Sequence, residues 1–125
     1  MKIKVSNIRI PVYKNSDYVI TGGGFSAISA AYVLAKNNKS VCLIVPGTFL
    51  GRELTSFTRP WETETNKFPD FLKKILDKSK KAKNDFINLN KLKIYLENLL
   101  LNQSVNIIYA SWPVGTVYHQ DSIKG

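Results

Sequence analysis

The chain has 125 residues, of which 44% are hydrophobic, and it carries a formal net charge of +9. This length suits one domain with a hydrophobic core, and the apolar content excludes disorder throughout the chain. The single cysteine, Cys42, excludes an intrachain disulfide and a cysteine-rich metal site, and no apolar run reaches the roughly 18 residues that span a bilayer. We find no signal peptide at the N-terminus, and therefore expect a cytoplasmic protein without membrane contact.

The first half of the chain predicts a strand, a helix and a second strand. Residues 1–17 alternate weakly and contain Pro11, so we expect an N-terminal extension or an added edge strand there. Tyr18–Thr21 is a short β-type run that ends at three glycines, and Ser26–Lys36 has apolar residues at helical spacing. Ser40–Val45 is a continuous apolar run, which is typical of a strand buried on both faces and places Cys42 in the core.

The second half predicts a loop over Thr48–Lys67, amphipathic helices over Phe68–Lys83 and Leu89–Asn102, and a third strand over Val105–Ala110. After that strand, the letters GTVYHQDS have the pattern of a strand that enters a hairpin turn. The order strand–helix–strand–helices–strand predicts an α/β fold with a three-stranded parallel sheet and right-handed crossovers. We expect three layers, and we expect Tyr18–Thr21 to be an unprotected edge of the sheet.

Positive charge is concentrated in residues 67–93, which contain nine lysines against three aspartates. Such an excess can bind the phosphates of a nucleic acid, and Trp61 and Trp112 could stack on its bases. A solvated lysine face is the simpler interpretation, because every cation in this segment is a lysine and the whole chain is rich in lysine and asparagine. The two tryptophans each adjoin a proline, and we expect both to anchor loops.

The letters TGGGFSA between the first strand and the first helix have the spacing of a dinucleotide-binding turn. Gly22 permits the tight turn out of the strand, and Gly24 leaves no Cβ between the backbone and a diphosphate. Ala27 is small enough for the helix to lie close to the sheet. The N-terminus of that helix would attract the diphosphate through its unpaired N–H groups and its dipole. A glycine turn in another α/β fold is the alternative.

The stretch DYVITGGGFSAISAAYVLAKNNKSVCLIVPGTFLG resembles the opening of FAD-dependent oxidoreductases of the glutathione-reductase-like superfamily. The branch it resembles most has a GGG-x-x-G/A turn and, after the second strand, a Phe-Leu-Gly-Gly stretch. A weaker similarity continues in KLKIYLENLLLNQSVNIIYASWPVG. The resemblance implies a partial Rossmann-like FAD/NAD(P)-binding domain over residues 18–125, C-terminally incomplete and ending in the start of a β-meander.

The resemblance also implies positions for the ADP half of FAD. The residues that match the phosphate turn are Gly22, Gly24 and Ala27, with Gly23, Phe25 and Ser26 between them. After the second strand, Gly51 and Arg52 stand at the positions of two glycines of the family. Val114 stands at the position where the main chain of the family contacts the adenine. Val45 stands where the family has a Glu or Asp that binds the adenosine ribose. Loss of that charge-assisted pair would weaken binding by about 1.5–3 kcal/mol, or roughly 10–150-fold.

The predicted function is therefore that of the N-terminal FAD-binding segment of a flavin-dependent oxidoreductase, truncated and not catalytically competent alone. Its partners would be FAD and a complementing C-terminal polypeptide. We expect no catalytic residue and no metal site in this part of such an enzyme. The alternatives are a non-catalytic nucleotide-binding remnant or scaffold and, in third place, a basic nucleic-acid-binding module.

Overall fold

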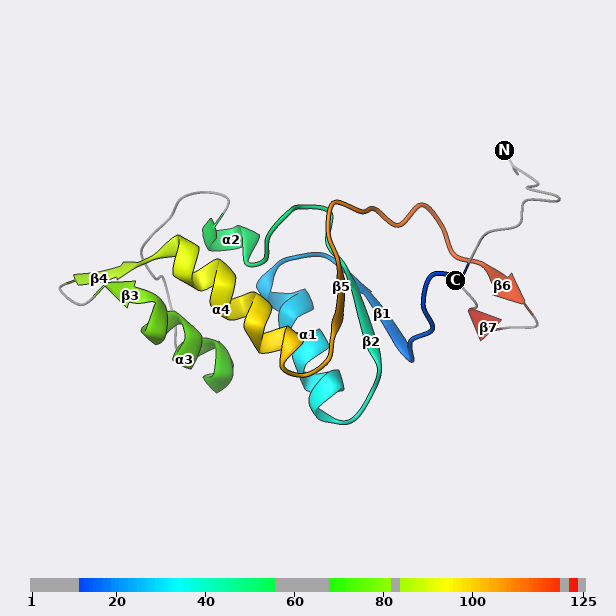
Figure 1. Ribbon diagram of the computed structural model, residues 1–125, viewed down its shortest axis with the longest axis horizontal. Helices are drawn as coiled ribbons and strands as arrows, with labels where there is room; N and C mark the ends of the chain where they lie inside the picture. The colour runs from blue at the N-terminus through cyan, green and yellow to red at the C-terminus, as the bar shows by residue number, and fades with distance from the viewer. Residues whose placement is uncertain (1–11, 56–67, 82–83, 120–121, 124–125) are drawn as a thin grey trace.

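The computed structural model describes residues 12–55, 68–81, 84–119 and 122–123. Its centre is a parallel sheet of three strands, β1 (Tyr18–Thr21), β2 (Val41–Ile44) and β5 (Asn106–Ile108), in the order β1-β2-β5 (Figure 1). The predicted three-stranded parallel sheet is confirmed. Strand β2 is buried, whereas β1 lies at the edge of the sheet as expected, with Val19 61% exposed.

Two helices, α1 (Phe25–Lys36) and α4 (Leu89–Leu101), lead into β2 and β5 and lie against each other on one side of the sheet (Figure 1). One row of the sheet, Ile20, Leu43 and Ile107, is in register and belongs to the core under these helices. The fully buried apolar side chains of this core come from both layers and include Ile28, Leu43, Val45, Leu50, Leu92, Leu96 and Leu100.

The opposite face of the sheet carries Val19, Cys42 and Asn106 in register. Cys42 is buried, as predicted, and the Asn106 amide donates a hydrogen bond to its Sγ at 3.6 Å. Within the described residues no helix packs on this face, so this part of the chain forms two layers and not the predicted three. The two crossovers run in the same direction along the sheet, which explains why right-handed connections place both helices on one face.

Beyond α4 lies a helix–hairpin unit made of α3 (Asp70–Ser79), β3 (Lys80–Lys81) and β4 (Asn84–Ile87). The prediction that this helix continues to Lys83 is wrong. Ser79 is fully buried and its carbonyl oxygen accepts a hydrogen bond from the Asn88 amide at 2.7 Å, and the chain is extended at Lys80. Pairing of β3 with β4 therefore outweighs the helical propensity of the lysines.

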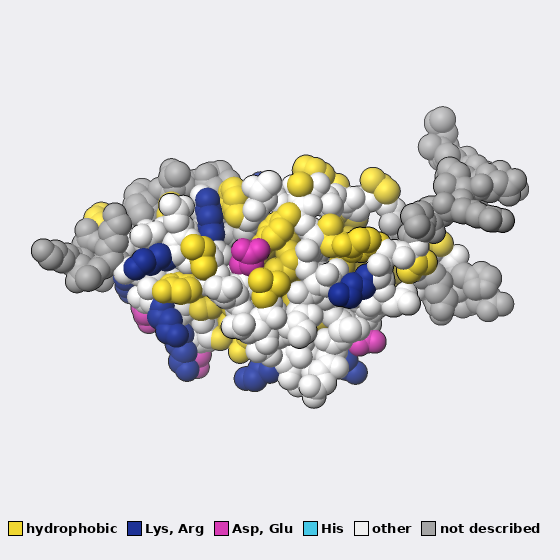
Figure 2. Space-filling view, in the orientation of Figure 1, with side chains coloured by type: hydrophobic (Ala, Val, Ile, Leu, Met, Phe, Trp, Pro, Cys, Tyr) yellow, Lys and Arg dark blue, Asp and Glu magenta, His cyan; other side chains and the backbone are white. Residues whose placement is uncertain are grey.

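On α3, Lys74 and Lys78 are exposed and Lys73 is partly exposed, and Figure 2 shows most of the basic side chains at this end of the molecule. Lys73 contacts Asp70 at 3.4 Å and Lys80 contacts Asp77 at 3.0 Å, one turn apart on α3 and at its end. Both aspartates are largely exposed. These contacts are those of a solvated helix surface, and surface pairs of this kind add at most about 1 kcal/mol each.

The predicted loop Thr48–Lys67 contains a short helix, α2 (Arg52–Thr55), which the sequence analysis missed. Thr55 is buried, and its hydroxyl donates to the carbonyl oxygens of Leu50 and Gly51 at 3.1 and 2.9 Å. The helix is held against α4. The remaining part of that loop, with Trp61, lies outside the described residues.

After β5 the chain runs without helix or strand to a two-stranded antiparallel hairpin, β6 (Tyr118–His119) and β7 (Ser122–Ile123). This agrees with the predicted strand, while most of the predicted turn (residues 120–121) lies outside the described part of the chain. The hairpin lies away from the three-stranded sheet (Figure 1). Trp112, on the connecting stretch, is 67% exposed, so the prediction that it anchors this loop is wrong. Residues 12–17 form no strand, and residues 1–11 lie outside the described part of the chain.

Candidate dinucleotide site at the start of α1

The turn from β1 into α1 has the backbone conformation that its glycines predict. Gly22 has a φ of +123°, in the region that favours glycine, and its amide donates to the Ile44 carbonyl oxygen at 2.8 Å. A Cβ on Gly22 would lie 3.5 Å from the Cβ of Ala27, an ordinary contact distance. Ala27 therefore lies close to the turn, at the position where the dinucleotide-binding pattern has a small residue.

A second glycine, Gly51, ties the loop after β2 to this turn. Its amide donates to the Gly23 carbonyl oxygen at 2.7 Å, and its φ is +73°. A Cβ on Gly51 would lie 2.6 Å from Cδ1 of Leu96, so only glycine lets α4 approach this closely. The same loop also meets α4 at its rim, where the Lys93 ammonium lies 4.1 Å from the centre of the Phe49 ring. The structure thus brings the two glycine loops together, 28 residues apart in sequence.

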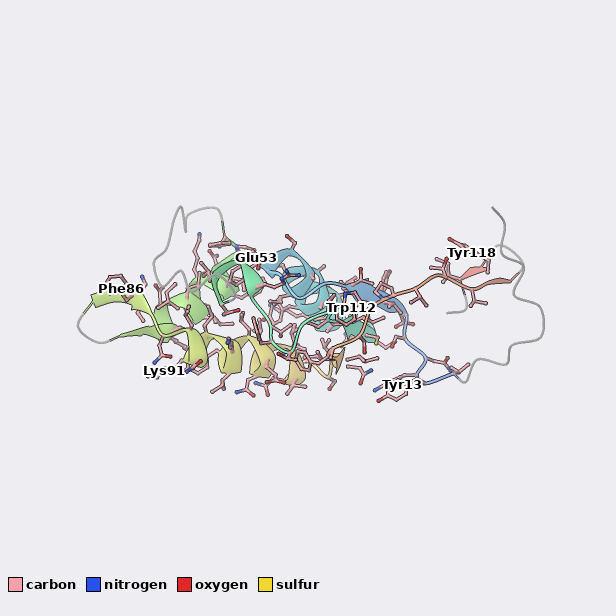
Figure 3. All side chains as sticks on the ribbon, turned by 90° about the horizontal axis from the view of Figure 1, so that it is seen from above. Tyr13, Glu53, Phe86, Lys91, Trp112 and Tyr118 are labelled. Carbon is pink, nitrogen blue, oxygen red and sulfur yellow. The ribbon has the colours of Figure 1, made fainter. Side chains whose placement is uncertain are left out.

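The N-terminus of α1 is hydrogen-bonded to a carboxylate of the same chain. The amide of Phe25, the first helical residue, donates to Oε1 of Glu53 at 3.0 Å. A Cβ on Gly24 would collide with that carboxylate, whose Cδ would be 2.9 Å away. Figure 3 shows Glu53 projecting from α2 next to α1. The space that the absent Cβ of Gly24 leaves for a phosphate is therefore filled here by Glu53.

Other amides of the same turn are free. In the described part of the chain no hydrogen bond reaches the amides of Gly24, Ser26 or Ala27. The Ser26 side chain is exposed, and the hydroxyl of Ser29 donates back to the Phe25 carbonyl oxygen at 2.7 Å. Unpaired N–H groups at a helix N-terminus and the helix dipole together favour a bound anion. The amides of Gly24, Ser26 and Ala27 are therefore donors that an anion could use, whereas the Phe25 amide is already bonded to Glu53.

The position of the expected ribose-binding acid is apolar and closed. Val45 is fully buried, and its Cγ1 would lie 2.7 Å from a Cβ on Gly23. Its amide donates to the Ile108 carbonyl oxygen at 2.8 Å, and its carbonyl oxygen accepts from the Ser111 amide at 3.2 Å. The side chain packs under the glycine turn and offers no acceptor to a ribose. The residues present fit the phosphates of FAD but not its adenosine ribose.

Two further candidate residues lie outside this cluster. Arg52 begins α2 with an exposed side chain, and no hydrogen bond or ion pair links it to another described residue. It is the next residue, Glu53, and not Arg52, whose side chain fills the turn. Val114 is fully exposed on the stretch between β5 and β6, so its side chain packs against no part of the glycine turn. The position of Val114 next to an adenine remains a prediction from resemblance.

The contact of Glu53 with α1 was not predicted from the sequence. The signal for this contact is weak, since the two residues are 28 positions apart and Glu53 lies on a four-residue helix that was itself missed. Elsewhere in the described residues there is no cluster of His, Cys, Asp or Glu that could hold a metal ion. None of the described helices is long and apolar enough to span a membrane.

A parallel β–α–β unit with a glycine turn at the start of its helix is characteristic of a Rossmann-like fold. Comparison with known families makes the class more specific, because the pattern of the FAD dependent oxidoreductase family matches residues 17–125. The chain belongs to the FAD dependent oxidoreductase family.

Among solved structures, THI4 of Thermovibrio ammonificans is similar to this chain, with a TM-score of 0.51 and 15% sequence identity. The similarity covers 75% of this chain and 38% of the THI4 chain, so the present chain spans well under half of that protein. At this identity the likeness shows the fold alone. No curated protein sequence matches the chain.

Proposed function

We propose that this chain is the N-terminal, ADP-binding segment of a flavin-dependent oxidoreductase. The observation that supports the proposal is the glycine turn at Gly22–Gly24, which is hydrogen-bonded to the Gly51 loop and in which no described residue accepts a hydrogen bond from the amides of Gly24, Ser26 and Ala27. FAD, when bound, supplies the electron-transfer chemistry. The residues of this chain would bind the diphosphate through their main chain and orient the cofactor. The residues that face the substrate would belong to another part of the enzyme, which a complementing C-terminal polypeptide would supply.

FAD should bind to this chain more weakly than to a site that has an acidic residue for the adenosine ribose. With Val45 in that place, the free-energy loss is about 1.5–3 kcal/mol, the cost of a missing charge-assisted hydrogen-bond pair. The remaining affinity for FAD would come from contacts of the chain with the diphosphate and with the adenine. The proposal also includes a cytoplasmic location for the protein.

The proposal is tested by titrating FAD into the purified chain and following flavin fluorescence and heat. ADP should compete with FAD, because both carry the diphosphate and the adenosine, whereas riboflavin should not compete. Competition by riboflavin but not by ADP would contradict the assignment of the ADP half to these residues. Absence of any FAD binding, alone or with a complementing polypeptide, would remove the proposal.

A second candidate is a non-catalytic remnant or scaffold that keeps the fold but no longer uses FAD. Two observations favour it: the buried Val45 and the Glu53 carboxylate on the Phe25 amide. The two candidates differ in one measurable property. Flavin reduction by the chain with a complementing polypeptide would exclude the remnant, and FAD binding without any reduction would favour it.

A further inference from the structure

The contact between Glu53 and the start of α1 places a negative charge where the proposed function requires a phosphate. Glu53 Oε1 accepts the Phe25 amide hydrogen bond at 3.0 Å, and its carboxylate lies against the Cα of Gly24. A carboxylate and a phosphate are both anions that accept hydrogen bonds from helix N-terminal amides. The protein therefore supplies its own anion to this amide.

The Glu53 carboxylate and a diphosphate cannot both bind at the start of α1. The Phe25 N–H is one donor and is directed at Glu53 Oε1, and the carboxylate takes the place that a Cβ on Gly24 would occupy. Two like charges 4 Å apart also repel by about 4 kcal/mol at the effective dielectric constant of a protein surface. A diphosphate that binds at the start of α1 must therefore displace the Glu53 side chain.

The structure allows this displacement without a change of fold. Helix α2 is held by main-chain bonds from Leu54 and Thr55 to the Gly51 carbonyl oxygen at 3.1 and 2.9 Å, and by the buried Thr55 hydroxyl. None of these bonds involves the Glu53 side chain. Glu53 is exposed, so its carboxylate can rotate into water while α2 remains in place.

We propose that Glu53 is an internal competitor for the phosphate position, and that it lowers the affinity of this chain for FAD and other diphosphate ligands. The inference rests on the proposed function, because it assumes that the diphosphate would bind at the start of α1. Displacement of one charge-assisted hydrogen bond sets the expected size of the effect. We expect about a tenfold loss of affinity, which corresponds to about 1.4 kcal/mol.

The test compares the unaltered chain with Glu53→Ala, which removes the carboxylate, and Glu53→Gln, which keeps a neutral acceptor. Asp70→Asn is the matched control, because it changes the net charge equally at an exposed position on α3. At low ionic strength, Glu53→Ala should bind FAD and ADP about tenfold more tightly, Glu53→Gln should lie between, and Asp70→Asn should change affinity less than twofold. Circular dichroism confirms that each variant is folded.

Inorganic pyrophosphate gives a readout that does not depend on FAD. It should raise the Tm of Glu53→Ala more than that of the unaltered chain or of Asp70→Asn. Equal or weaker FAD affinity in Glu53→Ala would overturn the inference and leave the proposed function standing. A pyrophosphate effect confined to Glu53→Ala, with no FAD binding by any variant, would support the inference and remove the proposed function. No response of any variant to either ligand would overturn both.

Discussion

At the scale of single residues, Gly51 fixes the distance between the glycine turn and α4. Its φ of +73° costs a residue with a side chain about 1–2 kcal/mol. A Cβ there would also lie 2.6 Å from Cδ1 of Leu96, which is fully buried. We therefore expect Gly51→Ala to lower the free energy of unfolding by about 3 kcal/mol, because strain and overpacking act together.

Urea unfolding followed by circular dichroism measures this change. Gly115→Ala is the control, since a Cβ at Gly115 meets nothing within 4 Å and the φ of Gly115 is not in the left-handed region. That variant should stay within about 0.5 kcal/mol of the unaltered chain. Equal effects of the two substitutions would show that Gly51 is not under the constraint described here.

Gly24 and Glu53 should be energetically coupled. The backbone of Gly24 has a φ of −84°, which alanine can adopt, so the cost of Gly24→Ala comes from the collision of its Cβ with the Glu53 carboxylate. A double-mutant cycle isolates this term. We expect a coupling free energy of about 1 kcal/mol, the value of a solvent-exposed charge-assisted hydrogen bond. Additive effects of Gly24→Ala and Glu53→Ala would mean that the carboxylate does not occupy the turn.

The sequence predicted the positions in the site that depend on backbone conformation, and missed the one that depends on a distant side chain. Gly22, Gly24 and Ala27 could be predicted from their spacing after a strand, because the role of each depends on residues close to it in sequence. The bond from Phe25 to Glu53 follows only from the path of the chain between them. That path depends on the packing of Gly51 against α4, which no local pattern encodes.

At the scale of helices and strands, the prediction was right where an element buries an apolar face and wrong where an element is short or polar. Strand β1 and helices α1 and α4 lie within one residue of their predicted ends. Helix α2 has four residues, too few to show a helical period. The β3–β4 hairpin was missed because lysine favours helices, and only its pairing in the fold makes it extended.

Helix α4 is the element that connects the glycine turn to the core. Leu96, in its middle, is fully buried and would touch a Cβ on Gly51, whereas Ile94 on the same helix is 56% exposed. We expect Leu96→Ala to lower the free energy of unfolding by about 3 kcal/mol, because it leaves a cavity in the core. Ile94→Ala should cost less than about 1 kcal/mol. Chemical denaturation of both variants tests this difference, and equal costs would contradict the packing of α4.

A hydrogen bond from the Tyr109 hydroxyl to Glu97 at 3.2 Å joins the segment after β5 to α4. Burial of Tyr109, and secondly the charge of Glu97, raise the pKa of this phenol well above its ordinary value of 10.0. The unfolded chain therefore releases the Tyr109 proton near pH 10, while the folded chain retains it. The stabilisation is complete below pH 10 and decreases as the pH rises further.

We expect the free energy of unfolding to decrease between pH 9 and pH 11 more steeply in the unaltered chain than in Tyr109→Phe. Urea unfolding at several pH values measures both slopes. The two proteins differ only in the Tyr109 hydroxyl, so the difference between the slopes reports on Tyr109. Parallel slopes would show that burial and Glu97 do not raise the pKa of Tyr109 in the folded chain.

At the scale of the whole molecule, the helices cover one face of the sheet, and β1 forms an exposed edge. The chain spans 38% of the length of THI4, with which it shares this fold. Family membership and fold together support a place for the diphosphate of FAD, but two side chains of this chain oppose its use. Val45 is a buried apolar residue where a ribose-binding acid was expected, and the Glu53 carboxylate accepts the hydrogen bond of the Phe25 amide.

The most direct measurement of the central claim is the backbone amide resonance of Phe25 in ¹⁵N-labelled protein during a titration with FAD. In the free chain, Glu53→Ala should shift this resonance more than any other outside α2, because it removes the acceptor of the Phe25 N–H. On addition of FAD, the Phe25, Gly24 and Ser26 amides should shift together, at lower FAD concentration in Glu53→Ala. A Phe25 resonance that responds neither to the substitution nor to FAD would contradict the account.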